Sequence, residues 1–383
     1  MSPAARIGAL ILTLCSGQAL AQGGNAVPCT CGVWSLDGPE PADSRLGGCA
    51  AAPSQLDANG CPLPPLLYES PRGLWYVANE VVALRRDADE SRVFATLTTP
   101  TDDVLNTNDL QFENQAGLRV IVGRELDDWF ALEGSFLGLM QWDEQKAVRD
   151  ATANSQATTG NLFSPFTGFG NPATVGLDFN NLASIRLISS LDIAELNVRQ
   201  RIDTAPSIMR ATALYGFRYM RIREQFAYRT ESLAPVPAGT LNSVDVETGN
   251  QMYGFQIGGS LEFRVAPRCW LNFEGKAAIC DNQADQHTLY TTGPLAQPNA
   301  PITRFRGEDH TVFAGDLSAA LEFQFTPGIV GRIGYQALLI DGLALASENF
   351  ESNVQVLTLG PAELVHDGSA IYHGPFVGLT VTW

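Results

Sequence analysis

The clearest pattern in the chain is an alternation of apolar and polar residues from His310 to Ile340. Phe313, Leu317 and Leu321 lie on one phase, and Asp316 and Glu322 on the other. The alternation breaks at residues 326–328, a Thr-Pro-Gly sequence, and then resumes. Successive side chains of a β-strand point to opposite sides of the sheet, so a period of two predicts strands with one apolar and one polar face.

The same period recurs along most of the chain and predicts ten strands. They cover residues 74–85, 112–125, 129–142, 185–201, 208–224, 251–265, 270–280, 311–325, 330–345 and 371–383. Long periodic segments are a firmer prediction than their ends.

The connections between these strands alternate strictly in length. Four are short and mostly rich in turn-forming residues, near 126–128, 203–206, 266–269 and 326–328. Five are long and polar: 86–111, 143–184, 225–250, 281–309 and 346–370. Outer-membrane barrels combine short periplasmic turns with longer external loops, whereas both ends of a soluble sandwich or lipocalin meet the same water. An even strand number also predicts that both termini are periplasmic.

Charged residues fall mostly on the phase opposite to the bulky apolar ones. Hydrocarbon excludes unpaired charge, so we expect the apolar phase to face lipid and the polar phase to face the lumen. The lumen-facing candidates are Arg119, Glu133, Arg210, Arg218, Glu262, Arg264, Glu274, Lys276, Asp316, Glu322 and Arg332. Such mixed charges can steer solutes, or can pair with one another and close the pore. The strands alone leave both alternatives open.

The two ends of the sequence indicate export and membrane assembly. Residues 1–21 have a basic start, an apolar stretch and a small-residue site that ends at Ala21, as in a signal peptide. The chain ends with Gly378, Val381 and Trp383, which resemble the assembly signal read by the outer-membrane insertion machinery. Phe376 departs from that signal, which prefers a polar residue there.

Residues 22–72 are rich in Pro, Gly and Cys, show no periodicity and are predicted to form a periplasmic extension. Export permits disulfides, but the connectivity is not readable from the sequence. The cysteines concerned are Cys29, Cys31, Cys49, Cys61, Cys269 and Cys280. The last two lie near opposite ends of one predicted strand, roughly 36 Å apart at ~3.3 Å per residue, so they are not expected to pair.

Composition excludes some partners. The formal net charge is −17 and Lys146 and Lys276 are the only lysines, which argues against nucleic acid. The four histidines show no metal-ligand spacing, and Asp309-His310 is only a weak candidate for a hydrolase at the barrel rim. We therefore expect no cofactor, no metal and no enzymatic activity.

Three segments in the middle of the chain resemble a known family. They are residues 190–197 (SLDIAELN), 215–219 (YGFRY) and 250–258 (NQMYGFQIG), with Trp75-Tyr76 before Glu80 fitting the first strand. Together they resemble the β-barrel porin family of planctomycete outer-membrane proteins. The resemblance covers most of residues 73–383 and implies a bacterial outer-membrane barrel in contact with lipid.

The sequence thus predicts an all-β, transmembrane, antiparallel up-and-down β-barrel over residues 73–383. We expect about ten strands, or 12 if the two longest loops hide two more. The predicted function is passive passage of small solutes through a polar lumen. The alternative is a closed structural or surface-interaction barrel, because a barrel of this strand number is narrow. Oligomeric state is not readable.

Overall fold

Ten antiparallel strands close into a ring in the computed structural model, which describes residues 74–87, 91–97, 102–150, 160–202, 208–232, 240–291, 301–360 and 362–383. The ring is closed by β1 pairing with β13, and Trp75 and Trp383 exchange backbone hydrogen bonds of 3.1 and 3.0 Å. The predicted all-β barrel is confirmed. In ring order the strands are β1 (Trp75–Arg86), β4 (Gln115–Glu125), β5 (Phe130–Arg149), β7 (Asn180–Ile202), β8 (Met209–Ser232), β9 (Thr240–Ala266), β10 (Cys269–Thr291), β11 (Ile302–Thr326), β12 (Ile329–Leu343) and β13 (Gly368–Thr382).

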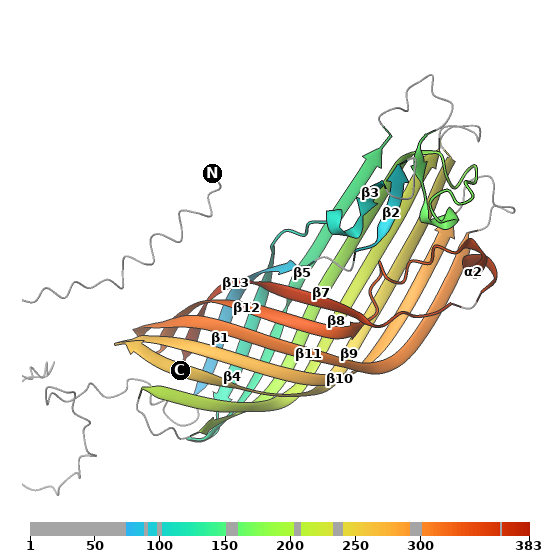
Figure 1. Cartoon of the computed structure of the whole chain (residues 1–383). Coiled ribbons are helices and arrows are strands. Elements are labelled where there is room, and N and C mark those ends of the chain that lie inside the picture. Colours follow the sequence, from blue (N-terminus) through green and yellow to red (C-terminus); the bar gives the residue numbers. More distant parts are fainter. Residues whose placement is uncertain are drawn as a thin grey trace, which may run out of the picture. The chain divides into compact units, whose positions relative to one another are not determined.

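Short turns join neighbouring strands at one end of the ring, and long connections lie at the other (Figure 1). Two residues separate β9 from β10 and β11 from β12, and four separate β4 from β5. The start of β1 and the end of β13 lie at this short-turn end, as the Trp75–Trp383 pair shows. The predicted signal peptide and periplasmic extension lie outside the described residues.

The long connections contain small elements that do not join the ring. They are β2 (Val93–Leu97), β3 (Asp103–Asn106), β6 (Leu162–Phe163), the short helices η2 (Thr107–Asp109) and η3 (Pro165–Thr167), and α2 (Val354–Leu359). The extra strands pair in the order β3-β2-β6 and reach the barrel at β7. The ring therefore has ten strands, not 12. Within the described residues, no helix has the length and hydropathy needed to cross a bilayer.

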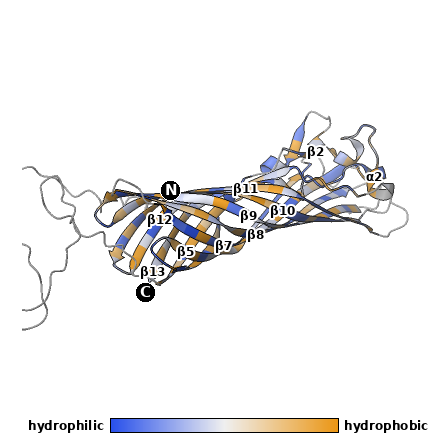
Figure 2. Ribbon diagram, turned by 90° about the horizontal axis from the view of Figure 1, so that it is seen from below, coloured by the Kyte–Doolittle hydropathy of each residue, from blue (hydrophilic) through white to orange (hydrophobic). Residues whose placement is uncertain are grey.

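Six strands, β5 and β7 to β11, run well past their predicted ends. Much of 225–250 and 281–309, predicted as loop, is strand. The cause is an inversion of the two faces, which β8 shows clearly. Near the short-turn end Phe217 points outward and Arg218 inward, whereas farther along Arg221 and Arg223 point outward and the inward residues become apolar. Hydropathy changes accordingly along the ribbon (Figure 2).

A belt of exposed apolar side chains surrounds the part of the ring nearer the short turns. Phe255 is 78% exposed, Leu317 70% and Ile257 70%, although large apolar residues are normally buried. Hydrocarbon is the solvent that such a surface matches. The belt also contains Val81, Val122, Leu132, Phe136, Leu139, Leu196, Phe217, Phe273, Ile279, Phe313, Ile333, Leu339, Val377, Leu379 and Val381.

Candidate functional site: the filled lumen

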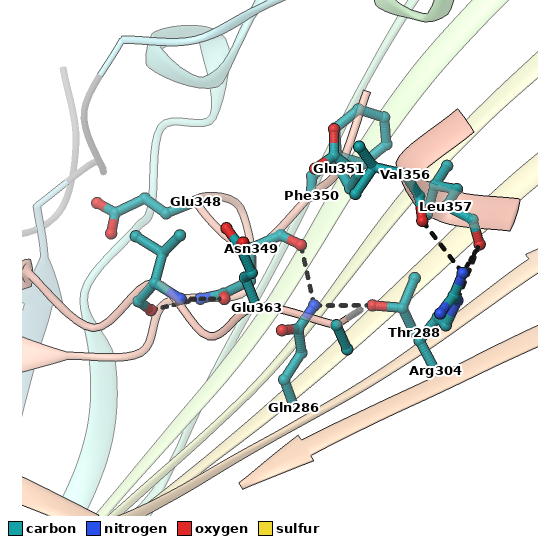
Figure 3. Close-up of a pocket in the computed structure, with 12 residues that line it drawn as sticks. Gln286, Thr288, Arg304, Glu348, Asn349, Phe350, Glu351, Val356, Leu357 and Glu363 are labelled. Atoms are coloured by element: carbon teal, nitrogen blue, oxygen red, sulfur yellow. Dashed lines mark hydrogen bonds between the residues drawn. The ribbon is translucent and has the colours of Figure 1, made fainter. Parts of the chain in front are cut away.

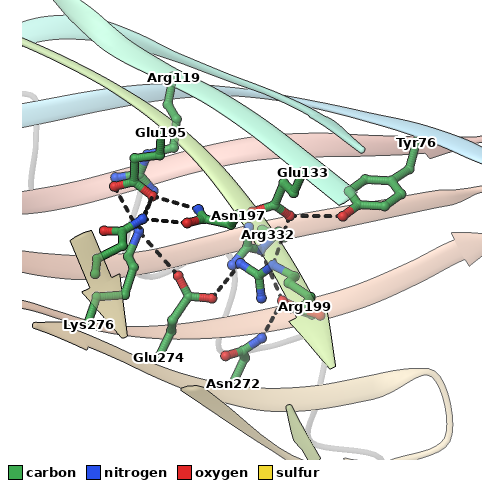
Figure 4. Close-up of polar contacts among 12 residues, drawn as sticks. Tyr76, Arg119, Glu133, Glu195, Asn197, Arg199, Asn272, Glu274, Lys276 and Arg332 are labelled. Carbon is green, nitrogen blue, oxygen red and sulfur yellow. Dashed lines mark hydrogen bonds and ion pairs between the residues drawn. The ribbon is translucent and has the colours of Figure 1, made fainter. Parts of the chain in front are cut away.

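The lumen inside the apolar belt contains a layer of paired charges (Figure 4). Arg199 of β7 forms an ion pair with Glu133 of β5 at 3.0 Å and donates a hydrogen bond to Glu274 of β10 at 2.7 Å, and so links β5 to β10, which are not neighbours in the ring. Tyr76 of β1 donates its hydroxyl to Glu133 at 2.9 Å. Lys276 lies 3.6 Å from Glu274 and extends the network along β10.

Arg218 lies at the end of this charged layer that is farther from the short turns. Its side chain is fully buried and pairs with Glu195 of β7 at 2.6 Å and with Asp316 of β11. Glu195 also accepts from Lys276 at 3.0 Å and from Gln256 at 3.1 Å. A buried charge is tolerated when it is paired and hydrogen-bonded. The Nη2 of Arg218 meets this condition through Glu195 and Asp316, whereas its Nε and Nη1 have no hydrogen-bond partner among the described residues.

A second cluster surrounds Glu80 of β1, whose side chain is fully buried. It accepts from Arg119 at 2.9 Å and from Arg332 at 2.7 Å, and Arg332 also contacts Glu322 at 3.0 Å. Both arginines lie over the ring of Phe376, at 5.4 and 5.8 Å from its centroid. Phe376 therefore points into the lumen and makes cation–π contacts with this cluster, which gives the unexpected residue in the terminal strand a structural role.

The remaining charged candidates lie nearer the short-turn rim. Arg210 is 4.0 Å from Glu262, at the limit of an ion pair, and both side chains are partly exposed. Arg264 forms no ion pair with any described residue; its backbone amide donates to Ile208. The rim also has a tight pair that the sequence did not suggest, Arg201 with Glu125 at 2.7 Å.

Beyond Arg218 the lumen becomes apolar and closes. Inward side chains from every ring strand except β4 are buried there: Leu84, Trp142, Leu187, Leu191, Met220, Ile222, Met252, Ala278, Cys280, Val312, Ile340 and Tyr372. One ion pair crosses this layer. Arg86 of β1 donates to Glu224 of β8 at 2.6 Å with both side chains fully buried. No disulfide joins Cys269 and Cys280, as expected from their places on β10.

The long connections fold into the mouth of the barrel and plug it. The ring centroids of Phe94 of β2 and Phe350 of the β12–β13 connection are 5.0 Å apart, and those of Phe94 and Phe226 of β8 are 4.8 Å apart. Phe166 of η3 packs against Phe350 at 5.6 Å and against Tyr290 at 5.5 Å. We call residues 344–350, with Phe94 and Phe166, the plug. Its residues 344–347 and 349–350 are buried.

Polar side chains hold the plug through its backbone. Arg92 donates to the carbonyls of Ser347 at 3.1 Å and Phe350 at 2.6 Å. Asn250 of β9 both donates to and accepts from the backbone of Ala344, each at 2.9 Å. Burial lowers the pKa of the Arg92 guanidinium below its ordinary value, and the Glu351 and Glu348 carboxylates oppose that change. These bonds satisfy backbone groups that would otherwise be costly to bury.

A hollow lies beside the plug, between β10, β11 and the residues around α2 (Figure 3). Gln286 donates to Thr288 at 2.9 Å and to the carbonyl of Asn349 at 3.1 Å. Arg304 donates to the carbonyls of Leu357 at 2.7 Å and Val356 at 3.1 Å, and so caps the end of α2. The Gln286 amide and the Arg304 guanidinium, which line this hollow, already donate hydrogen bonds to oxygens of the chain. The hollow is therefore explained as a structural contact between the barrel wall and the residues around α2.

Three of the four histidines lie within strands. His287, His310 and His373 are within strands, and only His366 is in a connection. The imidazoles of His310 and His366 stack at 4.1 Å, and His310 contacts the carbonyl of Gly342 at 2.7 Å. Asp309 is exposed on β11. Among the described residues, no group of three or more His, Cys, Asp or Glu side chains could hold a metal ion.

Several lumen residues were missed by the sequence reasoning, notably Glu195, Arg199 and the Arg86–Glu224 pair. The phase on β7 contained the necessary signal, because Leu196 and Val198 point outward and place Glu195 and Arg199 inward. The Arg86–Glu224 pair has no comparable signal, since its partners are 138 residues apart and come from opposite parts of the ring.

A ten-stranded ring with an apolar outer belt and inward ion pairs defines an outer-membrane β-barrel. The chain belongs to the family described as putative beta barrel porin-7 (BBP7), whose model matches residues 78–383. The planctomycete origin stays a prediction. Among curated proteins, no relative matches.

Three solved structures of other proteins are similar to this chain at low identity. The outer membrane protease OmpT from Escherichia coli has 12% identity and a TM-score of 0.43, with 82% of this chain and 99% of that chain covered. A FadL homologue from Pseudomonas aeruginosa has 12% identity and a TM-score of 0.25, with 83% and 93% covered. Ail, the attachment invasion locus protein of Yersinia pestis, has 8% identity and a TM-score of 0.23, with 82% and 100% covered.

Proposed function

We propose that this chain is a closed outer-membrane barrel that carries a folded, loop-filled platform outside the cell. The observation that carries the proposal is the filled lumen. Arg218 and Met252 point into the lumen, where an open pore would expose them to water, yet both are fully buried. The apolar layer and the plug fill the lumen farther from the short turns. In this proposal the short turns and both ends of the barrel face the periplasm.

The platform is the part of β5 and β7 to β11 that extends beyond the apolar belt. Its outer face is polar, with Arg186, Arg223, Glu247 and Gln283 exposed, and its inner face packs against the plug. Such a surface suits contact with water and cell-surface material better than contact with lipid. A structural or surface-interaction role follows from this arrangement.

Passive passage of small solutes is the second candidate, and membership of a family described as porins favours it. The charged layer would supply a polar path, since several of its side chains are partly exposed, including Arg199 and Asp316. Passage would require both the apolar layer and the plug to move. We therefore rank it below the closed barrel.

Chemical labelling of Cys280 separates the two candidates. Cys280 points into the lumen within the buried apolar layer and is 1% exposed. In folded protein a small charged methanethiosulfonate reagent is expected to leave Cys280 unmodified for as long as the barrel remains folded, with peptide mass mapping as the readout.

The matched control is Thr212→Cys. Thr212 also points into the lumen, but it lies on the short-turn side of the apolar layer, where its side chain is partly exposed. The introduced cysteine is expected to react readily. If Cys280 reacts as fast as the cysteine at position 212 while the strand signal in circular dichroism is intact, water reaches the middle of the lumen and the closed barrel is wrong.

A further inference from the structure

The outer wall of β8 and β9 shows a sharp change of chemistry at the edge of the apolar belt. Phe217 and Phe255 are directly paired, with ring centroids 6.1 Å apart. The next outward pair is Tyr219 with Tyr253, at 5.0 Å. Tyrosine suits the boundary between hydrocarbon and water because its ring is apolar and its hydroxyl is not. In the orientation proposed above, on which this inference rests, the tyrosine pair marks the outer interface of the membrane.

Two arginines follow directly above this tyrosine pair. Arg221 and Arg223 point outward from the same strand, roughly 7 Å apart at two residues of strand rise. Arg221 thus lies roughly 7 Å beyond Tyr219, at the height where lipid headgroups begin. Gly249 is the β9 partner of Arg223; the Asp285 carboxylate of β10 lies over that glycine but forms no ion pair with Arg223, which is exposed.

These arginines differ from other outward arginines of the platform. Arg186 pairs with Asp143 at 2.5 Å and Arg229 with Asp245 at 3.6 Å. Neither Arg221 nor Arg223 has an ion pair with a carboxylate of the described chain, although Asp192 is the strand partner of Arg221 on β7. The Nε of Arg221 is also shielded from solvent and has no hydrogen-bond partner.

We propose that Arg221 and Arg223 bind the phosphate of an anionic lipid of the outer leaflet. Guanidinium groups bind phosphate through charge-assisted, bidentate hydrogen bonds. The acyl chains of the same lipid would lie along Phe217, Phe255 and Ile257, which continue the wall below and are exposed. An adjacent pair of unpaired cations is an exception on a chain of net charge −17, so the pair provides local charge complementarity for an anion.

The test uses the full chain refolded in an uncharged maltoside detergent. Dimyristoyl phosphatidylglycerol is titrated, and bound lipid is counted by native mass spectrometry. The wild-type protein is expected to retain this lipid with at least tenfold higher affinity than dimyristoyl phosphatidylcholine. Arg221→Gln with Arg223→Gln is expected to remove that preference, and the Arg→Lys pair to restore part of it.

The matched control is Arg186→Gln with Arg229→Gln, which removes two outward arginines that already have partners and is expected to keep the preference. Equal binding of the two lipids by wild-type protein would overturn the proposal, as would equal loss in both double variants. Inorganic phosphate is added as a competitor. If millimolar phosphate displaces the lipid completely, the site recognises a free anion and the lipid assignment is wrong.

Discussion

Glu195→Gln is expected to lower the free energy of unfolding by about 3–5 kcal/mol, because it leaves two buried cations short of a partner. Glu195 pairs with Arg218 at 2.6 Å and with Lys276 at 3.0 Å, and only 6% of its side chain is exposed. Arg218 would retain Asp316, and Lys276 would retain Glu274 at 3.6 Å. The measurement is a reversible urea titration of the barrel in lipid vesicles.

Asp143→Asn provides the matched control for this prediction. It also removes one carboxylate from an arginine pair, but Asp143 and Arg186 lie on the outer face of the platform with 42% and 47% of their side chains exposed. Water and salt screen such a pair, so the free energy of unfolding should change little. Similar losses in the two variants would contradict the assignment of Glu195 to a desolvated layer.

Leu317→Arg is expected to destabilise the folded barrel by about 2–4 kcal/mol, the cost of a cation on the lipid face near the bilayer midplane. Leu317 is 70% exposed and lies within the outward apolar run of β11 between Phe313 and Phe325. In water, the same substitution at an exposed position would cost little. Equilibrium unfolding in vesicles of fixed lipid composition measures the difference.

Thr311→Arg separates the lipid effect from the effect of the mutation itself. Thr311 is on the same strand and the same outward face, but it lies beyond the apolar run and opposite Asp281 of β10. Its replacement should cost at most about 1 kcal/mol. If Thr311→Arg is as destabilising as Leu317→Arg, the belt is not the surface that meets lipid.

The number of strands and the closed topology could be predicted from the sequence because both depend on local signals. Period-two alternation can be recognised within a single strand. The alternation of short and long connections can be recognised from the lengths of the segments between strands. The segment from His310 to Ile340 contained the alternation and one short connection, and it corresponds to parts of β11 and β12 with the turn between them. The resemblance to β-barrel porins pointed to the same fold.

The filling of the lumen could not be predicted because it depends on contacts between distant parts of the chain. Arg92 reaches the carbonyl of Phe350, 258 residues away, and Phe94 meets the same residue. Nothing in the local pattern around residues 86–111 or 346–370 indicates that these connections turn inward. The polar composition of 225–250 was misread for a related reason. Its exposed polar residues, such as Gln225, Arg229 and Glu247, lie on the outer face of strands whose inner face packs on the plug.

The most direct test of the closed barrel is current recording across planar lipid bilayers that contain the refolded full chain, with insertion verified by co-flotation with vesicles of the same lipid. The filled lumen predicts that the membranes stay at their insulating baseline over a wide range of salt concentrations and voltages. Stable steps of current that scale with salt concentration, and that appear only when folded protein is present, would contradict the closed barrel and establish a conducting pore.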